Sequence, residues 1–300
     1  MNRRSRIPAT KNEWLEFRST NINSTDVAAL FGLSPYVTEF ELWHRLKSGT
    51  TIEIDPNERM KWGTRLETAI ALGIAEDNGF SVERKQEYID LPDHRLGSSF
   101  DFQIGGTGLL EIKNVDSLMF RDKWIDDGET LEAPEHIELQ VQHQLLVSGL
   151  EYAIIGALIG GNRVVQIRRD RDEEIISEIK IRSAKFWDSI DKNTPPPVDF
   201  KRDAEFIMKL NQFVNEGEVL DATEDDRLKD LAVAYKMAAL NAKNFEDAKA
   251  AAKAEMLTII GRAEKTHGKG FKISAGLTAE SVVSYTRKPY RDFRISWAKP

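Results

Sequence analysis

The chain has 300 residues, a formal net charge of −7 and no cysteine. Hydrophobic residues make up 41% and charged residues 30%, which is typical of a soluble globular protein with a sizeable core. Without cysteine there is no disulfide, no cysteine-ligated zinc and no cysteine nucleophile, as suits a reducing compartment. The negative charge argues against non-specific coating of nucleic acid. It allows a nucleic-acid enzyme, because a site that collects Mg²⁺ is itself acidic.

The sequence contains no apolar run of membrane-spanning length. Its basic start, MNRRSRIPATKNEW, is not followed by the apolar segment of a signal peptide. We therefore expect a cytoplasmic protein with no membrane partner, located in the bacterial host if the chain is phage-encoded.

Helical patterns dominate the first 80 residues. We expect helices in STDVAALFG (24–32), in SPYVTEFELWHRLKSG (34–49) and from about residue 58 to 78, each closed by a glycine. Strand patterns follow in FSVERKQEYID (80–90), RLGSSFDFQI (95–104) and GLLEIKNV (108–115).

The next 80 residues alternate helix and strand. PEHIELQVQHQLLVSG (134–149) reads as a helix, residues 152–161 and 163–170 as a strand hairpin, and 171–191 as an amphipathic helix. The run TPPPVDF then interrupts the chain. The order of elements predicts an α/β or α+β domain with a mixed sheet over residues 1–195.

Residues 196–300 have a different character. The Ala- and Lys-rich stretch 222–261 opens with a capping box of Thr223 and Asp226 and fits one long helix or a helical hairpin. Closing strands are expected in GFKISAGLTAE (270–280) and YRDFRISWAKP (290–300). We expect an accessory region for oligomerisation or partner contact.

A group of charged residues marks the strands around position 105. Glu111 and Lys113 are two positions apart, so their side chains share one strand face. Asp101 precedes them across a Gly-rich turn, which predicts a β-hairpin. Converging carboxylates suit Mg²⁺, and a lysine beside them can orient an attacking water and stabilise the forming hydroxide. Alternatively, Glu111 and Lys113 form only a structural ion pair on a half-exposed strand.

Two expected helices can add to this group. Glu67 in WGTRLETAI supplies a further carboxylate, and LQVQHQ places Gln140 and His143 on one face, since positions i and i+3 are neighbours. We keep His143 outside the catalytic set, because no serine nucleophile pairs with it. A polar face without a role is the alternative for Gln140 and Gln142.

The order of these motifs resembles the phage recombination exonucleases, the lambda-exonuclease and YqaJ-type branch of the PD-(D/E)xK nucleases. The resemblance covers roughly residues 10–190. It rests on the N-terminal signature NINSTDVAALFGLSPYVTEFELWHRLKSG, the helix WGTRLETAI with Gly63 and Glu67, the strand SSFDF, the strand LLEIK and the helix LQVQHQLLVSG.

This resemblance implies a PD-(D/E)xK, restriction-endonuclease-like core with a mixed central sheet flanked by helices. It implies a Mg²⁺-dependent exonuclease, with Mn²⁺ able to substitute, that degrades linear double-stranded DNA ends from 5′ to 3′. The single-stranded tails would serve phage-type recombination, with a ring-shaped homo-oligomer and a single-strand annealing protein as partners. The implied metal ligands are Asp101, Glu111, Glu67 and the carbonyl of Ile112, with Lys113 and Gln140 completing the catalytic set.

The same resemblance points to a 5′-phosphate site at Arg18, Ser24 and Thr25. An arginine fork, short hydroxyls and a helix start suit a terminal phosphate. The alternative is that Ser24 or Thr25 only caps a helix and that Arg18 is a solvated charge.

The chain departs from the family pattern at two places. Phe100 stands where the family often has proline, and Asn23-Ser24 where a glycine pair is common.

Two other functions stay open. They are a restriction or repair endonuclease on the same fold and a non-catalytic DNA-end-binding protein.

Overall fold

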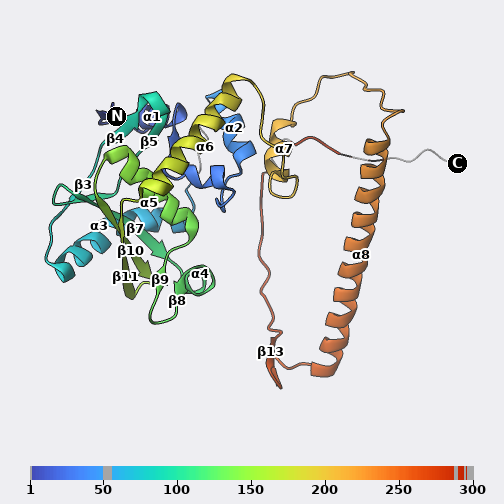
Figure 1. The fold of residues 1–300 in the computed structure, drawn as a ribbon. Coiled ribbons are helices and arrows are strands. Elements are labelled where there is room, and N and C mark those ends of the chain that lie inside the picture. Colours follow the sequence, from blue (N-terminus) through green and yellow to red (C-terminus); the bar gives the residue numbers. More distant parts are fainter. Residues whose placement is uncertain (1, 50–55, 287–289, 294, 296–300) are drawn as a thin grey trace. The chain divides into compact units, whose positions relative to one another are not determined.

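The computed structural model describes residues 2–49, 56–286, 290–293 and 295. The chain divides into two compact units, Met1–Ile207 and Met208–Pro300 (Figure 1). Within the described ranges, no helix combines the length and the apolar character needed to cross a membrane.

The first unit is built on a five-stranded sheet. Strand β7 is parallel to β10, whereas the other neighbouring pairs are antiparallel, so the sheet is mixed, as the sequence predicted. In spatial order its strands are β11 (Arg163–Asp170), β10 (Tyr152–Ile159), β7 (Gly108–Val115), β6 (Phe102–Ile104) and β3 (Val82–Arg84).

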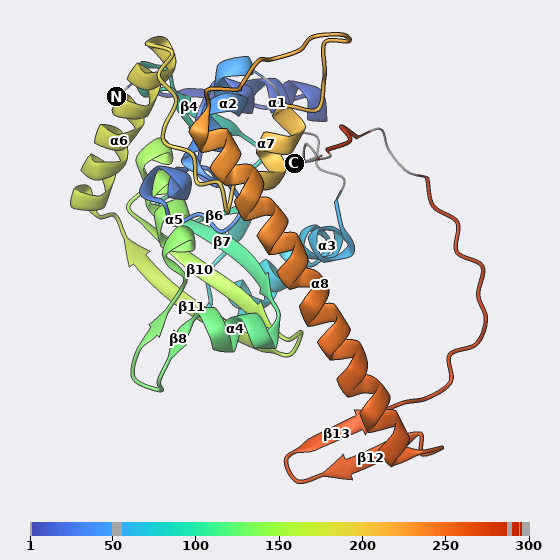
Figure 2. The same ribbon diagram turned by 90° about the vertical axis from the view of Figure 1, so that its right-hand side faces the viewer.

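Helices cover both faces of this sheet (Figure 2). Helix α3 (Glu58–Asn78) packs Ile70 and Ile74 against Leu110 and Ile112 of β7. Helix α5 (Glu135–Ser148) lies against the other face. Because side chains alternate along β7, Glu111 and Lys113 point away from α3 and toward α5.

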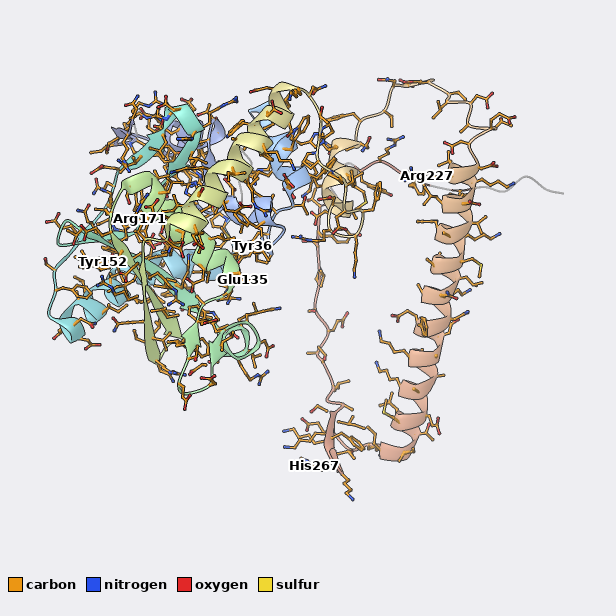
Figure 3. All side chains as sticks on the ribbon, viewed as in Figure 1. Tyr36, Glu135, Tyr152, Arg171, Arg227 and His267 are labelled. Atoms are coloured by element: carbon orange, nitrogen blue, oxygen red, sulfur yellow. The ribbon has the colours of Figure 1, made fainter. Side chains whose placement is uncertain are left out.

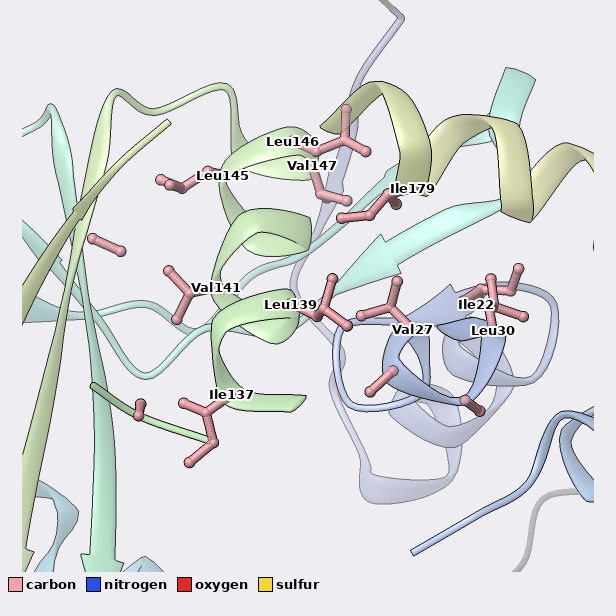
Figure 4. Packing of buried hydrophobic residues seen from close by; sticks show 14 of the residues in the cluster. Ile22, Val27, Leu30, Ile137, Leu139, Val141, Leu145, Leu146, Val147 and Ile179 are labelled. Atoms are coloured by element: carbon pink, nitrogen blue, oxygen red, sulfur yellow. The ribbon is translucent and has the colours of Figure 1, made fainter. Parts of the chain in front are cut away.

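A second sheet of four short strands lies on the far side of α5. Figure 4 shows Val141 and Leu145 of α5 pointing to one side of the helix, with Leu139 and Leu146 on the side of Val27. Helix α5 is therefore buried around most of its circumference. The second sheet has the order β1 (Arg4–Arg6), β4 (Tyr88–Leu91), β5 (Leu96–Ser98) and β2 (Ile22–Asn23).

The prediction of one strand each over 80–90 and 95–104 was wrong. Each segment forms two strands, and the members of each pair belong to different sheets: β3 and β4, then β5 and β6. The chain crosses between the sheets at Lys85–Glu87 and at Ser99–Asp101, and Lys85 N donates to the Asp101 carbonyl at 3.1 Å. This second crossing places Asp101 just before β6.

The helix expected over 24–32 is only a 3₁₀ turn, η1 (Val27–Phe31). It is preceded by Asp26 and ended by Gly32 at φ 71°, and no side chain caps it. The alternative that Ser24 or Thr25 caps this helix is therefore wrong. The helices expected from about residue 58 to 78, over 134–149 and over 171–191 are confirmed, and the helix expected over 34–49 begins only after its cap Thr38. The helices at Lys11–Ser19 and Ser117–Lys123 were not predicted.

The remaining elements of the first unit are short apart from one long helix. They are α1 (Lys11–Ser19), α2 (Glu39–Ser48), η2 (Pro92–His94), α4 (Ser117–Lys123), the two-stranded ribbon β8 (Ile125–Asp126) and β9 (Leu131–Glu132), and α6 (Glu173–Asp191).

The first unit extends past the proline run, beyond the boundary expected after residue 195. Asp203 is 1% exposed and accepts a hydrogen bond from Thr38, the cap of α2. Phe206, in α7 (Ala204–Leu210), makes an edge contact with Phe40 at 6.2 Å between ring centroids. These contacts explain why the compact unit ends at Ile207.

The second unit contains one unbroken helix, α8 (Asp226–Ile260), and not a helical hairpin. Its cap is Asp225, which accepts from Leu228 N, whereas Thr223 bonds Asp221. A hairpin of β12 (Lys265–Gly268) and β13 (Phe271–Ser274) follows. Of the strand expected over 290–300, residues 290–293 and 295 are not in a strand, and the others lie outside the described residues.

Candidate active site

Asp101 takes the position that a further residue of β6 would occupy beside β7. The two strands pair only as far as Phe102 opposite Leu110. Beyond that point Asp101 Oδ2 accepts the Ile112 N–H at 2.8 Å, replacing a backbone partner. The N–H and C=O of one strand residue point to the same edge, so the Ile112 carbonyl also faces the side of Asp101.

Glu111 lies at the centre of a buried polar network. Its side chain belongs to a central strand and is 5% exposed. Oε1 accepts from Lys113 Nζ and from Gln140 Nε2, both at 2.6 Å, while Lys113 Nζ also donates to Gln140 Oε1 at 3.0 Å. The ion pair of the alternative interpretation is present, but it lies inside this network and not on a half-exposed strand.

Gln144 is a member of the network that we did not anticipate. Its Nε2 donates to Glu111 Oε2 at 2.7 Å, and its own Oε1 is buried without a hydrogen-bond partner among the described residues. The available signal was its spacing of four from Gln140, which places both amides on one helix face. Gln142 points elsewhere and bonds the backbone of Asp170 and Asp172.

The charges in this site strongly perturb one another. Burial raises the pKa of Asp101 to about 8, and the neighbouring Glu111 charge adds to the shift. Burial alone would lower the pKa of Lys113, but Glu111 and Asp101 outweigh it and raise that pKa. The lysine therefore stays charged, while the two carboxyl groups repel each other in a setting with little water.

Glu67 lies at the edge of this group. Its Oε2 accepts from Arg84 at 3.0 Å, and its side chain is partly exposed. Its charge contributes to the raised pKa of Asp101, so the two carboxylates are within electrostatic reach. Across the described residues, no three histidine, cysteine or acidic side chains gather closely enough to form a metal cluster.

Of the three residues expected to bind the 5′-phosphate, two lie together and one is turned inward. Arg18 stacks on Trp14 and donates to Thr25 Oγ1 at 3.1 Å. Ser24 instead is 3% exposed and accepts from Ser98 at 3.1 Å, so its hydroxyl is turned inward. Arg18 and Thr25 are the pair that remains available to a ligand.

A pocket of about 200 Å³ connects Thr25 with the polar network. Tyr36 stands at the pocket beside the start of α5, with an edge contact to His136 at 5.8 Å (Figure 3). Burial, followed by the charge of Lys113, lowers the pKa of His136. The pocket is lined by Thr25, Ala28, Ser34, Tyr36, Lys113, His136, Ile137 and Gln140.

His143 does not join the carboxylates, although it shares α5 with Gln140. It is fully buried on the side of Ile22 and Asp26, and burial lowers its pKa to about 4. A neutral imidazole is therefore part of the folded core.

This buried histidine predicts a loss of stability in acid. The folded-state pKa lies below the usual 6.5, so the unfolded chain binds the proton more readily. The stabilisation is fully present above pH 6.5 and is lost as the pH falls toward 4, by about 3 kcal/mol. Urea unfolding at pH 7 and pH 4.5 should show a smaller pH dependence for His143→Leu. The surface variant His267→Ala should retain the full pH dependence of the free energy of unfolding. If both variants showed the same pH dependence, His143 would not be its source.

Comparisons of the sequence identify relatives. The pattern described as a YqaJ-like viral recombinase domain matches residues 13–151. The protein YqaJ of Bacillus subtilis (strain 168) is 30% identical over 224 residues, which are 73% of this chain and 69% of that protein.

Comparison of the structure identifies the fold. An alkaline exonuclease, LHK-Exo from Laribacter hongkongensis, superposes with a TM-score of 0.52 at 23% identity, covering 66% of this chain and 100% of that one. Its complex with dAMP gives a TM-score of 0.52 at 24% identity, with the same coverage. The expected nuclease-type fold, a mixed sheet flanked by helices, is thereby confirmed. Together with the sequence matches, this shows that the chain belongs to the family of YqaJ-like viral recombinases.

Proposed function

We propose that this protein is a Mg²⁺-dependent exonuclease that degrades linear double-stranded DNA from 5′ to 3′ and leaves single-stranded tails for phage-type recombination. The observation that carries the proposal is the buried network of Glu111, Lys113 and Gln140, with Asp101 on the Ile112 N–H close by and a pocket beside it that also contains Thr25. Membership of a recombinase family and a fold shared with an alkaline exonuclease support this class of reaction.

The donor groups of the site fit a hard divalent cation. Asp101, Glu111, Glu67 and the Ile112 carbonyl offer only oxygen, which Mg²⁺ prefers and Mn²⁺ also accepts. The raised pKa of Asp101 reflects the repulsion that a cation would relieve. When bound, the metal polarises the phosphate and lowers the pKa of its water.

Lys113 and Gln140 act on the attacking water. The Lys113 ammonium is held between Glu111 and Gln140, so its position is fixed before substrate arrives. From there it orients the water and stabilises negative charge on the oxygen that attacks phosphorus. Water adds to phosphorus, the P–O3′ bond of the terminal nucleotide breaks, and that nucleotide leaves. Gln140 also donates to Glu111, so it holds the Glu111 carboxylate and the Lys113 ammonium in fixed positions relative to each other.

Arg18 and Thr25 bind the 5′-phosphate of the DNA end. Thr25 lines the same pocket as Lys113, and Arg18 donates to the Thr25 hydroxyl, so the planar guanidinium of Arg18 lies beside a residue of this pocket. Ser24 supports the loop through Ser98 and does not touch the phosphate. Because the terminal phosphate is held at one end of the pocket and the network lies at the other, cleavage proceeds from the 5′ end.

Arg18→Ala should erase the preference for 5′-phosphorylated over 5′-hydroxyl ends. The change removes the charge-assisted contact to the phosphate but no group of the polar network. Digestion of the two duplexes by the variant should differ by less than about twofold. Arg121→Ala, on an exposed helix, should keep the original preference. An unchanged preference in Arg18→Ala would place the phosphate site elsewhere.

Digestion of end-labelled linear duplex, with and without Mg²⁺ and beside a closed circular duplex, tests the proposed function. Metal-dependent release of nucleotides from the linear duplex alone supports the exonuclease. Cutting of the circle would favour a restriction or repair endonuclease, and binding without cleavage would favour a DNA-end-binding protein. The resemblance further implies a ring-shaped homo-oligomer and a single-strand annealing partner, which light scattering and co-purification would test.

A further inference from the structure

Helix α8 is long and has no core of its own. Its 35 residues span about 52 Å, and none of them is buried (Figure 3). Helices gain most of their stability in water by packing an apolar face against a partner. We therefore expect a partner to cover the exposed apolar side chains of α8.

The apolar residues of α8 follow a heptad pattern along almost the whole helix. Phe245 is 75% exposed and Ile259 is 78% exposed. Alternating steps of three and four residues define a coiled-coil seam, whereas a helix on a globular surface shows a wider stripe of period 3.6. The seam consists of Leu228, Leu231, Tyr235, Ala238, Ala242, Phe245, Lys249, Ala252, Met256 and Ile259.

One seam residue already has a contact, and some exposed apolar residues of α8 lie outside the seam. Tyr235 already contacts Phe293, at 5.5 Å between ring centroids, but remains 55% exposed. Val233, Met237 and Leu240 in the first half of the helix and Leu257 near its end are apolar and exposed outside the seam, but no large apolar residue outside the seam lies between positions 240 and 257. Only the heptad positions run from one end of α8 to the other.

A parallel pairing of two such helices would be poorly matched. In a parallel dimer each seam residue faces its own copy. Phe245 would then face Phe245, Ala242 would face Ala242, and two Lys249 ammonium groups would meet inside the seam. Large–large and small–small layers pack unevenly, and the paired lysines repel each other.

An antiparallel pairing matches large residues with small ones in the three central layers. Large and small side chains that alternate across an interface fill it without voids. At the two ends of the seam, aliphatic residues meet aliphatic residues. The layers are Leu228 with Ile259, Leu231 with Met256, Tyr235 with Ala252, Ala238 with Lys249, and Ala242 with Phe245.

The residues that flank the seam also favour the antiparallel direction. Apart from Arg227 at the start of the helix, the charged flanking residues lie in its second half, at Glu246, Lys253 and Glu255. The other flanking positions of the first half are small and neutral: Ala232, Ala234, Ala239 and Asn241. Antiparallel pairing places the charged half of one helix beside the neutral half of the other, so no like charges meet.

We propose that α8 forms an antiparallel coiled coil with α8 of a second copy of this chain. This pairing does not depend on the nuclease activity proposed above, and either can fail without the other.

Because the chain has no cysteine, single cysteines report this pairing directly in the full-length protein. Leu231→Cys and Met256→Cys are purified separately, mixed, equilibrated and oxidised. The mixture should give a disulfide-linked dimer, while each variant alone should not, because two copies of position 231 lie about 37 Å apart in this arrangement. The matched pair Val233→Cys and Ala254→Cys, at the same height on the outer face, should remain unlinked.

A charge in the seam provides the second readout. Ala242→Glu, added to both cysteine variants, should abolish the mixed disulfide, while Val233→Glu should leave it unchanged. Linked dimers from each single variant alone would establish a parallel pair and overturn the proposal. The absence of a linked dimer from the mixture would equally overturn it, because the seam would then be covered by another surface.

Discussion

Asp101→Asn should reduce DNA cleavage by about 10³-fold or more while DNA binding is retained. The substitution removes one of two neighbouring carboxylates, which lie just before β6 and at the centre of β7. Loss of a single preorganised charge at a reacting phosphate has effects of this size. Binding persists, because the substitution removes no positive charge that attracts the DNA phosphates.

The same variant should fold normally. The amide oxygen of asparagine can still accept the Ile112 N–H that Asp101 now accepts at 2.8 Å. Because the pKa of Asp101 is raised to about 8, the folded state binds its proton more tightly than the unfolded chain does. The metal-free protein therefore loses stability as the pH rises from about 4 to 8, and Asp101→Asn should lack this loss.

Nucleotide release from end-labelled duplex and fluorescence anisotropy with the same duplex measure cleavage and binding. Asp122→Asn, on an exposed helix, is the control and should behave as the unaltered protein. Cleavage at the normal rate by Asp101→Asn would rule out its assignment as a metal ligand.

The central part of the site could be predicted because it depends on local sequence. The alternation of β7 alone places Glu111 and Lys113 on one face, and helical spacing places Gln140 on a face of α5. The side of the sheet on which α5 packs depends on long-range contacts. The sequence therefore did not reveal that Gln144 also reaches Glu111, or that His143 faces the opposite side.

The boundaries between sheets could not be predicted for a similar reason. Residues 95–104 carry a continuous strand pattern, yet the chain leaves one sheet at Ser98 and joins the other at Phe102. Only the pairing partners, β4 on one side and β7 on the other, decide where the break occurs. Asp101 lies in this break, so its contact with the Ile112 N–H could be seen only in three dimensions.

Lys113→Ala should lower kcat by about 10³-fold or more and change KM little. The ammonium contacts Glu111 and Gln140 and lines the pocket, so it is positioned to stabilise charge that develops on the attacking oxygen. An interaction that strengthens only in the transition state affects kcat, whereas one that binds substrate and transition state equally affects KM.

The control for this variant is Lys85→Ala. The Lys85 side chain is 10% exposed, and its ammonium bonds Gln103 at 3.1 Å, outside the network. Lys85→Ala therefore shows how much activity is lost when a largely buried lysine is removed while Lys113, which orients the water, stays in place. In Lys113→Ala the Glu111 carboxylate keeps its contacts with Gln140 and Gln144, so thermal unfolding should still show a cooperative transition. A rise in KM at unchanged kcat would mean that Lys113 holds a phosphate of the substrate and does not act on the water.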